Sequence, residues 1–329
     1  MKTFVIAEAG ANHNKNFNQA LKLIDVAKEA GASAVKFQTY SADTLYSKNT
    51  PDFAGYKNIN QLIDNIALPR EWQYDLKQYS DEIGIEFMST PFDEKAVNEL
   101  YNLGVKRFKI AGFEATDLRF IRLVASTKRP LIISAGIGCS IEFIDRILSI
   151  CYDEKNYDVT FLHANNAYPT PQTDANLNTM VKIAEVYNKP VGLSDHTTST
   201  LTPALAVTLG ASVIEKHYTL SKLLPGPDHP FALEPSQLKE MIDNIILAEQ
   251  SLGEKNGYTE SEKGFINAQR SVVSKIPLKS GDILTPANIT TKRPFIKGNV
   301  PASEFYNILN KPINKDISED TAINLNDII

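Results

Sequence analysis

Two histidines lie near the ends of two short, strongly apolar segments. His196 falls in PVGLSDHT (190–197), and His217 falls in SVIEKHYT (212–219). Both segments have the pattern of buried β-strands, so both imidazoles should lie at strand ends. Two imidazoles with oxygen ligands suit a divalent metal such as Mn²⁺, with Mg²⁺ or Co²⁺ as alternatives, and leave positions for water and substrate. Glu8 and Asp228 are candidate oxygen donors; a hydrogen-bonded pair of histidines beside a cleft is the alternative.

Two lysines occupy the same kind of position. Lys36 and Lys109 lie in the apolar segments 33–39 and 105–111 of a chain whose formal net charge is -5. Two inward lysines in an acidic protein indicate an anionic ligand. Short donors suited to phosphate or carboxylate oxygens end the other segments: Ser89, Thr90, Ser134, Asn166 and Ser194. A Schiff base between one lysine and a carbonyl substrate is the alternative.

These residues belong to a repeating series of β-branched runs. The runs cover residues 4–7, 33–39, 85–90, 105–111, 130–136, 158–166, 190–197 and 212–219. Helix-like stretches with apolar spacing near 3.6, such as FNQALKLIDVAKEAGA, separate them. Eight alternations predict an α/β protein with a closed (β/α)₈ TIM barrel of roughly 250 residues. A doubly wound open sheet is the alternative.

The barrel prediction places the candidate residues at one mouth, because the chemistry of such barrels lies at the C-terminal ends of the strands. Strand side chains alternate between faces. Glu215 and His217 should therefore face the mouth together with Glu8, and Lys216 should point outward as a structural residue or pair with a neighbouring acid.

A metal beside an anion pocket suits the condensation of phosphoenolpyruvate with an aldehyde. The nucleophilic C3 of phosphoenolpyruvate would attack an aldehyde that the metal polarises. Water would then capture the cation left at C2. Glu8 is the candidate group to take the proton of that water, after which phosphate leaves.

The chain composition limits the other function classes. The 329 residues are 43% hydrophobic, enough for more than one domain, and the net charge of -5 argues against a nucleic-acid partner. The two cysteines are expected to be reduced thiols of a cytoplasmic protein. No run of 18 apolar residues predicts a membrane span.

The domain boundaries follow from local composition. Residues 1–252 should form the barrel, the polar stretch 253–269 a linker, and 270–329 a small β-rich domain with turn pairs. Before the last barrel helix, the proline-rich loop 220–235 carries Asp228 and His229, which could fold back over the barrel mouth.

Nine stretches in order resemble the sialic acid synthases, the phosphoenolpyruvate-dependent enzymes of the N-acetylneuraminate synthase type. They are IAEAGANHN (6–14), VKFQTY (35–40), MSTPFD (88–93), FKIAGFE (108–114), LHANNAYPTP (162–171), GLSDHT (192–197), VIEKHYTL (213–220), GPDHPFALEP (226–235) and TTKRP (290–294). The resemblance implies a TIM barrel followed by an SAF, or antifreeze-like, domain. It also implies a domain-swapped homodimer in which one chain's SAF domain covers the other's site.

The resemblance also implies residue roles. Glu8 is the catalytic glutamate, and His196 and His217 are catalytic metal ligands. The phosphoenolpyruvate contacts fall on Lys36, Thr90, Lys109, Ser134, Asn166 and Ser194. The sugar contacts fall on Gln38, Tyr168, Asp228 and, at the acyl group, Arg293.

The implied reaction joins phosphoenolpyruvate to an N-acylated amino-sugar aldehyde of the N-acetylmannosamine type and yields a nine-carbon sialic acid. Departures from the family pattern include Gly112 for the usual serine, Ala135, Ala164 and the segment Phe295–Gly298. They bear on the choice of sugar, so legionaminate or pseudaminate synthesis from a 2,4-diacetamido-2,4,6-trideoxyhexose is the first alternative. A Schiff-base sialate lyase and a non-catalytic sugar-binding relic are the others.

Overall fold

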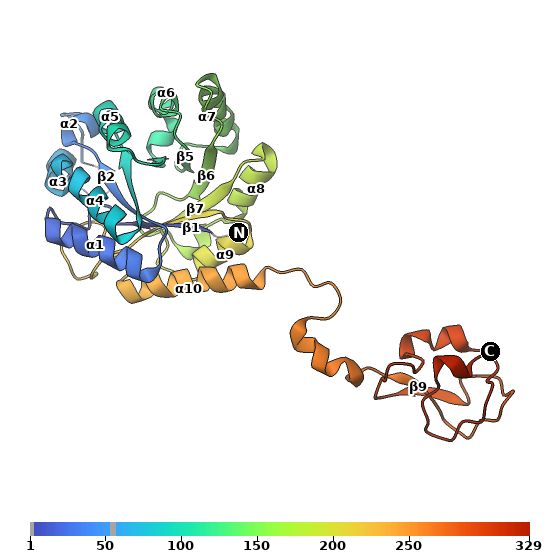
Figure 1. Cartoon of the computed structure of the whole chain (residues 1–329). Helices are drawn as coiled ribbons and strands as arrows, with labels where there is room; N and C mark the ends of the chain where they lie inside the picture. Colours follow the sequence, from blue (N-terminus) through green and yellow to red (C-terminus); the bar gives the residue numbers. More distant parts are fainter. Residues whose placement is uncertain (1–2, 53–56) are drawn as a thin grey trace. The chain divides into compact units, whose positions relative to one another are not determined.

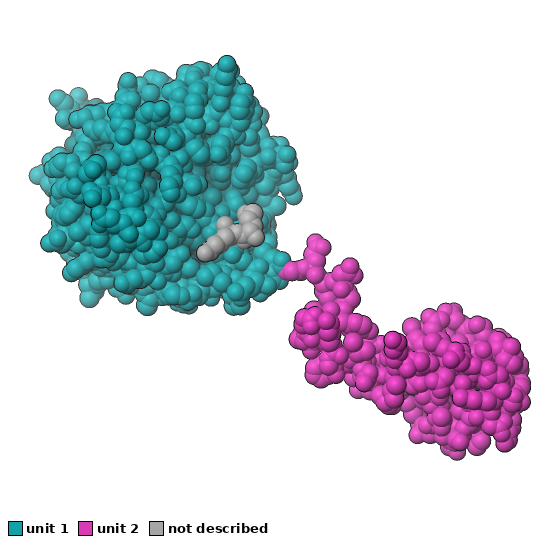
Figure 2. Space-filling model, viewed as in Figure 1, with its two compact units in different colours: residues 1–252 teal, residues 253–329 magenta. Residues whose placement is uncertain are grey.

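The chain forms two compact units. The computed structural model describes residues 3–52 and 57–329. The first unit is Met1–Leu252 and the second is Gly253–Ile329 (Figure 2). Within residues 3–52 and 57–329, none of the helices combines the length and the hydrophobicity that a membrane span requires.

Eight parallel strands build the first unit (Figure 1). They are β1 (Phe4–Glu8), β2 (Ala34–Thr39), β3 (Glu86–Pro91), β4 (Phe108–Ile110), β5 (Leu131–Ala135), β6 (Val159–Ala164), β7 (Val191–Asp195) and β8 (Val213–His217). Their order is β3-β2-β1-β8-β7-β6-β5-β4, and the terminal strands β3 and β4 lie side by side. Sequential neighbours with β8 paired to β1 make a barrel. The TIM-barrel prediction is confirmed, and the open-sheet alternative is wrong.

Helices connect the strands and surround the barrel (Figure 1). They are α1 (Phe17–Ala30), α2 (Ala42–Leu45), α3 (Ile59–Ile66), α4 (Gln73–Ile83), α5 (Glu94–Leu103), α6 (Leu118–Ser126), α7 (Ile141–Asp153), α8 (Asn178–Tyr187), α9 (Thr202–Thr208) and α10 (Pro235–Ser251). Local sequence sets their ends. The Asn16 side chain accepts a hydrogen bond from the Gln19 amide at 3.1 Å and caps α1, which ends at the left-handed Gly31.

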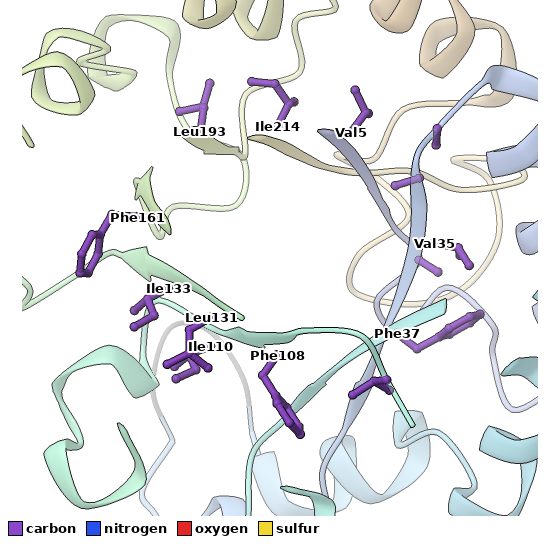
Figure 3. Close-up of a cluster of buried hydrophobic side chains, with 14 of the residues drawn as sticks. Val5, Val35, Phe37, Phe108, Ile110, Leu131, Ile133, Phe161, Leu193 and Ile214 are labelled. Carbon is purple, nitrogen blue, oxygen red and sulfur yellow. The ribbon is translucent and has the colours of Figure 1, made fainter. Parts of the chain in front are cut away.

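The outward side chains of the strands form the main core. Val5, Phe37, Phe108, Leu193 and Ile214 are buried in this cluster, which includes residues of the surrounding helices (Figure 3). β-branched and aromatic residues suit such a surface, because they pack well on a pleated sheet covered by helices. This layer fixes the strands and therefore the positions of the inward side chains.

Two layers fill the inside of the barrel. The lower layer is a small apolar cluster that includes Ile6, Ala34, Met88, Ile132, Leu162 and Val213. Two residues further along those strands lie Glu8, Lys36, Thr90, Ser134, Ala164 and Glu215. Since side chains repeat a face every second residue, this set forms the layer above, at the C-terminal mouth.

The second unit has its own core. Strands β9 (Ser271–Ser274) and β10 (Ile289–Lys292) pair antiparallel. The buried cluster consists of Val272, Leu278, Leu284, Ile289, Val300, Ile308, Ile313, Ile317 and Ile323. The stretch predicted to be a linker contains a 3₁₀ helix at Glu260–Ala268, none of whose residues is buried. Composition alone identified the polar character of that stretch but not its helical turns.

Candidate active site

The upper layer of the barrel lines a polar cavity with about 340 Å³ of empty volume. Eleven of the predicted site residues line it: Glu8, Lys36, Gln38, Thr90, Lys109, Ser134, Asn166, Tyr168, Ser194, His196 and His217. Glu215 completes its charged residues. The structure therefore brings together most of the predicted site from strands that are distant in sequence.

Lys36 lies in contact with two carboxylates and a hydroxyl. Its Nζ is 2.8 Å from Glu8 Oε2 and 3.7 Å from Glu215 Oε2, and it donates a hydrogen bond to Thr90 Oγ1 at 2.8 Å. Burial alone would lower the pKa of Lys36, but Glu215 and Glu8 outweigh burial and raise this pKa above its usual value. Lys36 is thus a fixed cation inside the barrel.

Glu215 joins the two lysines. Its Oε1 lies 3.3 Å from Lys109 Nζ and accepts a hydrogen bond from Ser194 Oγ at 3.2 Å. Burial would raise the pKa of Glu215, but Lys109 and Lys36 outweigh burial and lower this pKa to about 2. Burial lowers the pKa of Lys109 even though Glu215 opposes the change. Glu215 therefore stays ionised as the internal counter-charge of both lysines.

Glu8 is the carboxyl group in the cavity lining whose pKa is raised. Burial raises its pKa to about 7, against the lowering effect of Lys36. Gln38 Nε2 donates a hydrogen bond to Glu8 Oε1 at 2.8 Å and holds the carboxyl group in place. Two neighbouring carboxyl groups with separated pKa values, Glu8 and Glu215, are the arrangement in which one acts as a base and the other supplies charge.

Asn166 is seated on two glycines. Its Oδ1 accepts a hydrogen bond from the Ile137 amide at 2.7 Å. A Cβ added at Gly136 would lie 2.1 Å from Asn166 Oδ1, and one added at Gly112 would lie 2.9 Å from Asn166 Nδ2. Gly112, where the family pattern has serine, thus leaves room for the Asn166 amide. Ser134 Oγ is buried and has no hydrogen-bond partner among the described residues, so it is available to a ligand.

The two histidines lie side by side at the ends of the neighbouring strands β7 and β8, with ring centroids 5.6 Å apart. His196 Nδ1 lies 2.5 Å from the Asn165 carbonyl oxygen, a contact in which the ring nitrogen donates, so Nε2 keeps its lone pair. Burial lowers the pKa of both rings, for His217 well below the usual value. Both imidazoles are therefore neutral, the form that binds metals.

These two imidazole rings could supply two of the ligands of a metal ion. No group of three or more His, Cys, Asp or Glu side chains within residues 3–52 and 57–329 is arranged to hold a metal ion. His217 Nδ1 is buried without a hydrogen-bond partner among those residues, 4.0 Å from Asp228 Oδ2. A divalent ion would thus have His196 and His217 as its protein ligands and would take its other ligands from water or substrate.

Beside the cavity lies a larger groove with about 990 Å³ of empty volume. The two share Gln38, Tyr168 and His217 in their linings. The predicted sugar contact Asp228 lies in this groove rather than in the cavity, and its Oδ2 accepts a hydrogen bond from the Ala11 amide at 3.2 Å. The loop carrying Asp228 does fold back over the mouth, as the sequence predicted.

Two further residues considered in the sequence lie outside both the cavity and the groove. Lys216 points away from it and is buried against β7, 2.5 Å from Asp195 Oδ2, so the prediction of an outward structural lysine is confirmed. Arg293 belongs to the second unit, where it directly follows β10 and is exposed. Its predicted role at a substrate acyl group stays a prediction.

The sequence did not indicate the ion pairs of Glu215 or the position of Phe231 in the groove. Strand alternation placed Glu215 at the mouth, but nothing local showed that it would join Lys36 and Lys109 from two other strands. Phe231 was also missed, although its ring packs on His217 with centroids 5.1 Å apart and on Tyr168 at 5.4 Å. Its position inside the proline-rich loop was the only available signal.

Comparison with known proteins places the whole chain among related enzymes. Residues 23–257 match the NeuB family. The chain is 37% identical to the N,N'-diacetyllegionaminic acid synthase of Legionella pneumophila, over 98% of this chain and 94% of the relative. It is also 37% identical to a pseudaminic acid synthase of Campylobacter jejuni, over 99% and 96%.

A solved structure agrees with these relatives. The N-acetylneuraminic acid synthetase of Leptospira borgpetersenii superposes with a TM-score of 0.74 at 32% identity, over 82% of this chain and 91% of that one. This structural likeness accompanies a sequence match that covers most of the chain. The protein therefore belongs to the NeuB family, as the nine stretches of sequence indicated.

Proposed function

We propose that this protein condenses phosphoenolpyruvate with an N-acylated amino-sugar aldehyde to form a nine-carbon sialic acid and phosphate. The observation that carries the proposal is the charge arrangement of the cavity. Two buried lysines held by Glu215 lie beside two neutral histidines, and Glu8 has a pKa of about 7 in the same cavity. An anion site next to a metal-competent histidine pair is what this reaction needs.

The lysines and short donors bind phosphoenolpyruvate. Lys36, Lys109, Ser134, Ser194 and Thr90 surround one polar cavity, and charge-assisted hydrogen bonds from such groups hold phosphate and carboxylate oxygens. Asn166, seated between its two glycines, adds a side-chain amide. The enol C3 is thereby held for attack on the aldehyde of the sugar.

Glu8 moves the proton. As the carboxylate it accepts a proton from the water that adds to C2 of phosphoenolpyruvate after the carbon–carbon bond forms. The resulting intermediate then loses phosphate by cleavage of the C–O bond. Because the pKa of Glu8 is about 7, its carboxylate is basic enough to accept this proton, and the protonated carboxyl group readily returns to the carboxylate.

His196 and His217 would hold the divalent ion, with Mn²⁺ as the proposed metal and Mg²⁺ or Co²⁺ as alternatives. The ion would polarise the aldehyde oxygen of the sugar when bound. Burial keeps the imidazole rings of His196 and His217 neutral, the form that binds a metal. The Asn165 carbonyl fixes the tautomer of His196.

The sugar is proposed to extend from the cavity into the groove, towards Gln38, Tyr168 and Asp228. N-acetylmannosamine is the first sugar to test. A 2,4-diacetamido-2,4,6-trideoxyhexose is the second, because relatives named legionaminic and pseudaminic acid synthases are 37% identical to this chain. Arg293 and the domain-swapped homodimer remain part of the proposal; mixing Glu8→Gln and Arg293→Ala proteins should restore activity if one site uses both chains.

The test is phosphate release from phosphoenolpyruvate with Mn²⁺ and each sugar, against a reaction without sugar. Release that needs a sugar and disappears with EDTA supports the proposal. His217→Ala should abolish it and also remove Mn²⁺ binding measured by electron paramagnetic resonance. No release with any amino sugar would refute it. A pyruvate adduct on Lys36 or Lys109 trapped by borohydride would instead support the Schiff-base lyase.

A further inference from the structure

The helix α3 carries an apolar stripe that lies outside the main hydrophobic clusters of the chain. Ile59, Leu62, Ile63 and Ile66 recur at positions i, i+3, i+4 and i+7, so they share one face of the helix. None of the four belongs to the hydrophobic clusters described for the chain. An amphipathic helix normally buries such a face against the core, so this face has another partner.

That partner is the groove beside the catalytic cavity. All four residues of the stripe line the groove, together with Leu45, Tyr46, Phe92 and Phe113. Leu62, Ile63 and Ile66 remain half-buried, and Phe113 is 55% exposed. The lining also includes the polar residues Gln38 and Asp228. The groove therefore has both apolar and polar residues in its lining.

The groove adjoins the cavity, because some residues belong to both linings. The cavity is lined almost entirely by charged and polar groups that suit phosphoenolpyruvate, and it shares Gln38, Tyr168 and His217 with the groove. A sugar whose aldehyde meets phosphoenolpyruvate in the cavity would extend its remaining carbons past these shared residues and into the groove. The lining of that groove includes the stripe of α3.

We propose that the apolar stripe of α3 is a specificity site for an apolar substituent at the end of the sugar remote from its aldehyde. The substituents it would accept are a deoxy methyl group and the methyl of an acyl group. A free hydroxyl placed there would lose water without gaining a hydrogen bond from these four side chains. This inference rests on the proposed function and refines its substrate class.

The selectivity should be of moderate size. One methyl group in an apolar pocket changes kcat/KM by roughly 10–200-fold. A 4-acetamido-6-deoxy analogue of N-acetylmannosamine should therefore exceed N-acetylmannosamine itself in kcat/KM by at least about tenfold.

The experiment compares these two sugars in phosphate-release assays of the full-length chain. Leu62→Asn should reduce the ratio of the two kcat/KM values by about tenfold or more, because a polar group then replaces part of the apolar lining. Leu62→Ala, which keeps the lining apolar, should reduce it less. Asn65→Ala, on the exposed face of the same helix, is the matched control and should leave the ratio unchanged.

The outcomes separate the two proposals. Release with neither sugar refutes the proposed function itself. Release with both sugars at a ratio that Leu62→Asn does not change refutes the specificity site alone. A change in the oligomeric state of Leu62→Asn, measured by light scattering without a change in the ratio, would mean that a second copy of the chain covers the stripe. Far-ultraviolet circular dichroism of each variant confirms that the comparison is between folded proteins.

Discussion

Glu215 Oε1 lies 3.3 Å from Lys109 Nζ, in an ion pair buried inside the barrel. The same carboxylate lies 3.7 Å from Lys36 through its other oxygen. The protein therefore carries its own anion between the two cations that are proposed to bind phosphoenolpyruvate. A bound phosphoenolpyruvate would share these lysines with Glu215, and Lys36, whose pKa is raised by Glu215 and Glu8 against the effect of burial, would meet it as a cation that is already in position.

Lys109→Ala is expected to raise the KM for phosphoenolpyruvate by roughly 10–100-fold, the usual cost of losing a charged hydrogen bond. The KM for the sugar should change far less, because Lys109 lines the cavity but not the groove. Steady-state kinetics with each substrate varied in turn measures both constants. Lys182→Ala, at an exposed position of α8, is the control. Equal losses for both substrates would contradict the assignment of Lys109.

Glu215→Gln is expected to lower the free energy of unfolding by on the order of 3–5 kcal/mol, because it leaves two buried ammonium groups without their shared carboxylate. Phosphoenolpyruvate should then raise the Tm of the variant more than that of the wild type, since the ligand replaces the missing negative charge. Differential scanning calorimetry with and without phosphoenolpyruvate checks both points. Glu240→Gln, exposed on α10, serves for comparison, and an equal Tm increase in all three proteins would disprove the counter-charge role.

The rate should rise with pH through about 7, because the pKa of Glu8 is raised to about 7 and only its carboxylate form accepts a proton. In the folded protein this carboxyl binds its proton more tightly than in the unfolded chain. Its contribution to stability is therefore present below the unfolded pKa of about 4.3 and is lost as pH rises through 7.

The measurement is kcat against pH from 5.5 to 8.5, with Glu8→Gln as the test of assignment. The variant should lose most of its activity, and any residual rate should no longer rise with pH near 7. A rise that persists unchanged in Glu8→Gln would assign the titration to another group.

Gly136→Ala is expected to impair the use of phosphoenolpyruvate, because the added Cβ would lie 2.1 Å from Asn166 Oδ1 and displace that side chain. The KM for phosphoenolpyruvate should increase while the Tm of the protein changes little. Gly253→Ala, where an added Cβ meets no atom within 4 Å, is the matched control. Wild-type kinetics in Gly136→Ala would show that Asn166 has no part in binding.

Much of the barrel could be predicted because the burial of each strand is visible in its own sequence as a run of apolar residues. The runs around Val5 and Ile214 are apolar on both faces up to the glutamate that follows, as parallel strands covered on both sides must be. Strand alternation then assigned Glu8, Lys36 and His217 to the mouth. The weakest strand prediction was 105–111, of which only Phe108–Ile110 is a strand.

Features that depend on contacts between distant strands could not be predicted in the same way. The pairing of Glu215 with Lys36 and Lys109 requires the barrel to bring β8, β2 and β4 around one space, and no local pattern contains that distance. The stripe of α3 shows the opposite difficulty. Ile59, Leu62 and Ile66 have a helical period that predicts packing on the core, whereas these side chains face a groove.

The buried pair of Asp195 and Lys216 has a consequence for how β8 is aligned. The two residues are direct partners in the pairing of β7 with β8, on the outer side of the barrel. A slip of β8 by one residue would turn Lys216 into the cavity beside two other lysines and move Glu215 and His217 outward. The ion pair therefore favours the observed register, because this alignment of β8 both neutralises Asp195 and directs Glu215 and His217 into the mouth.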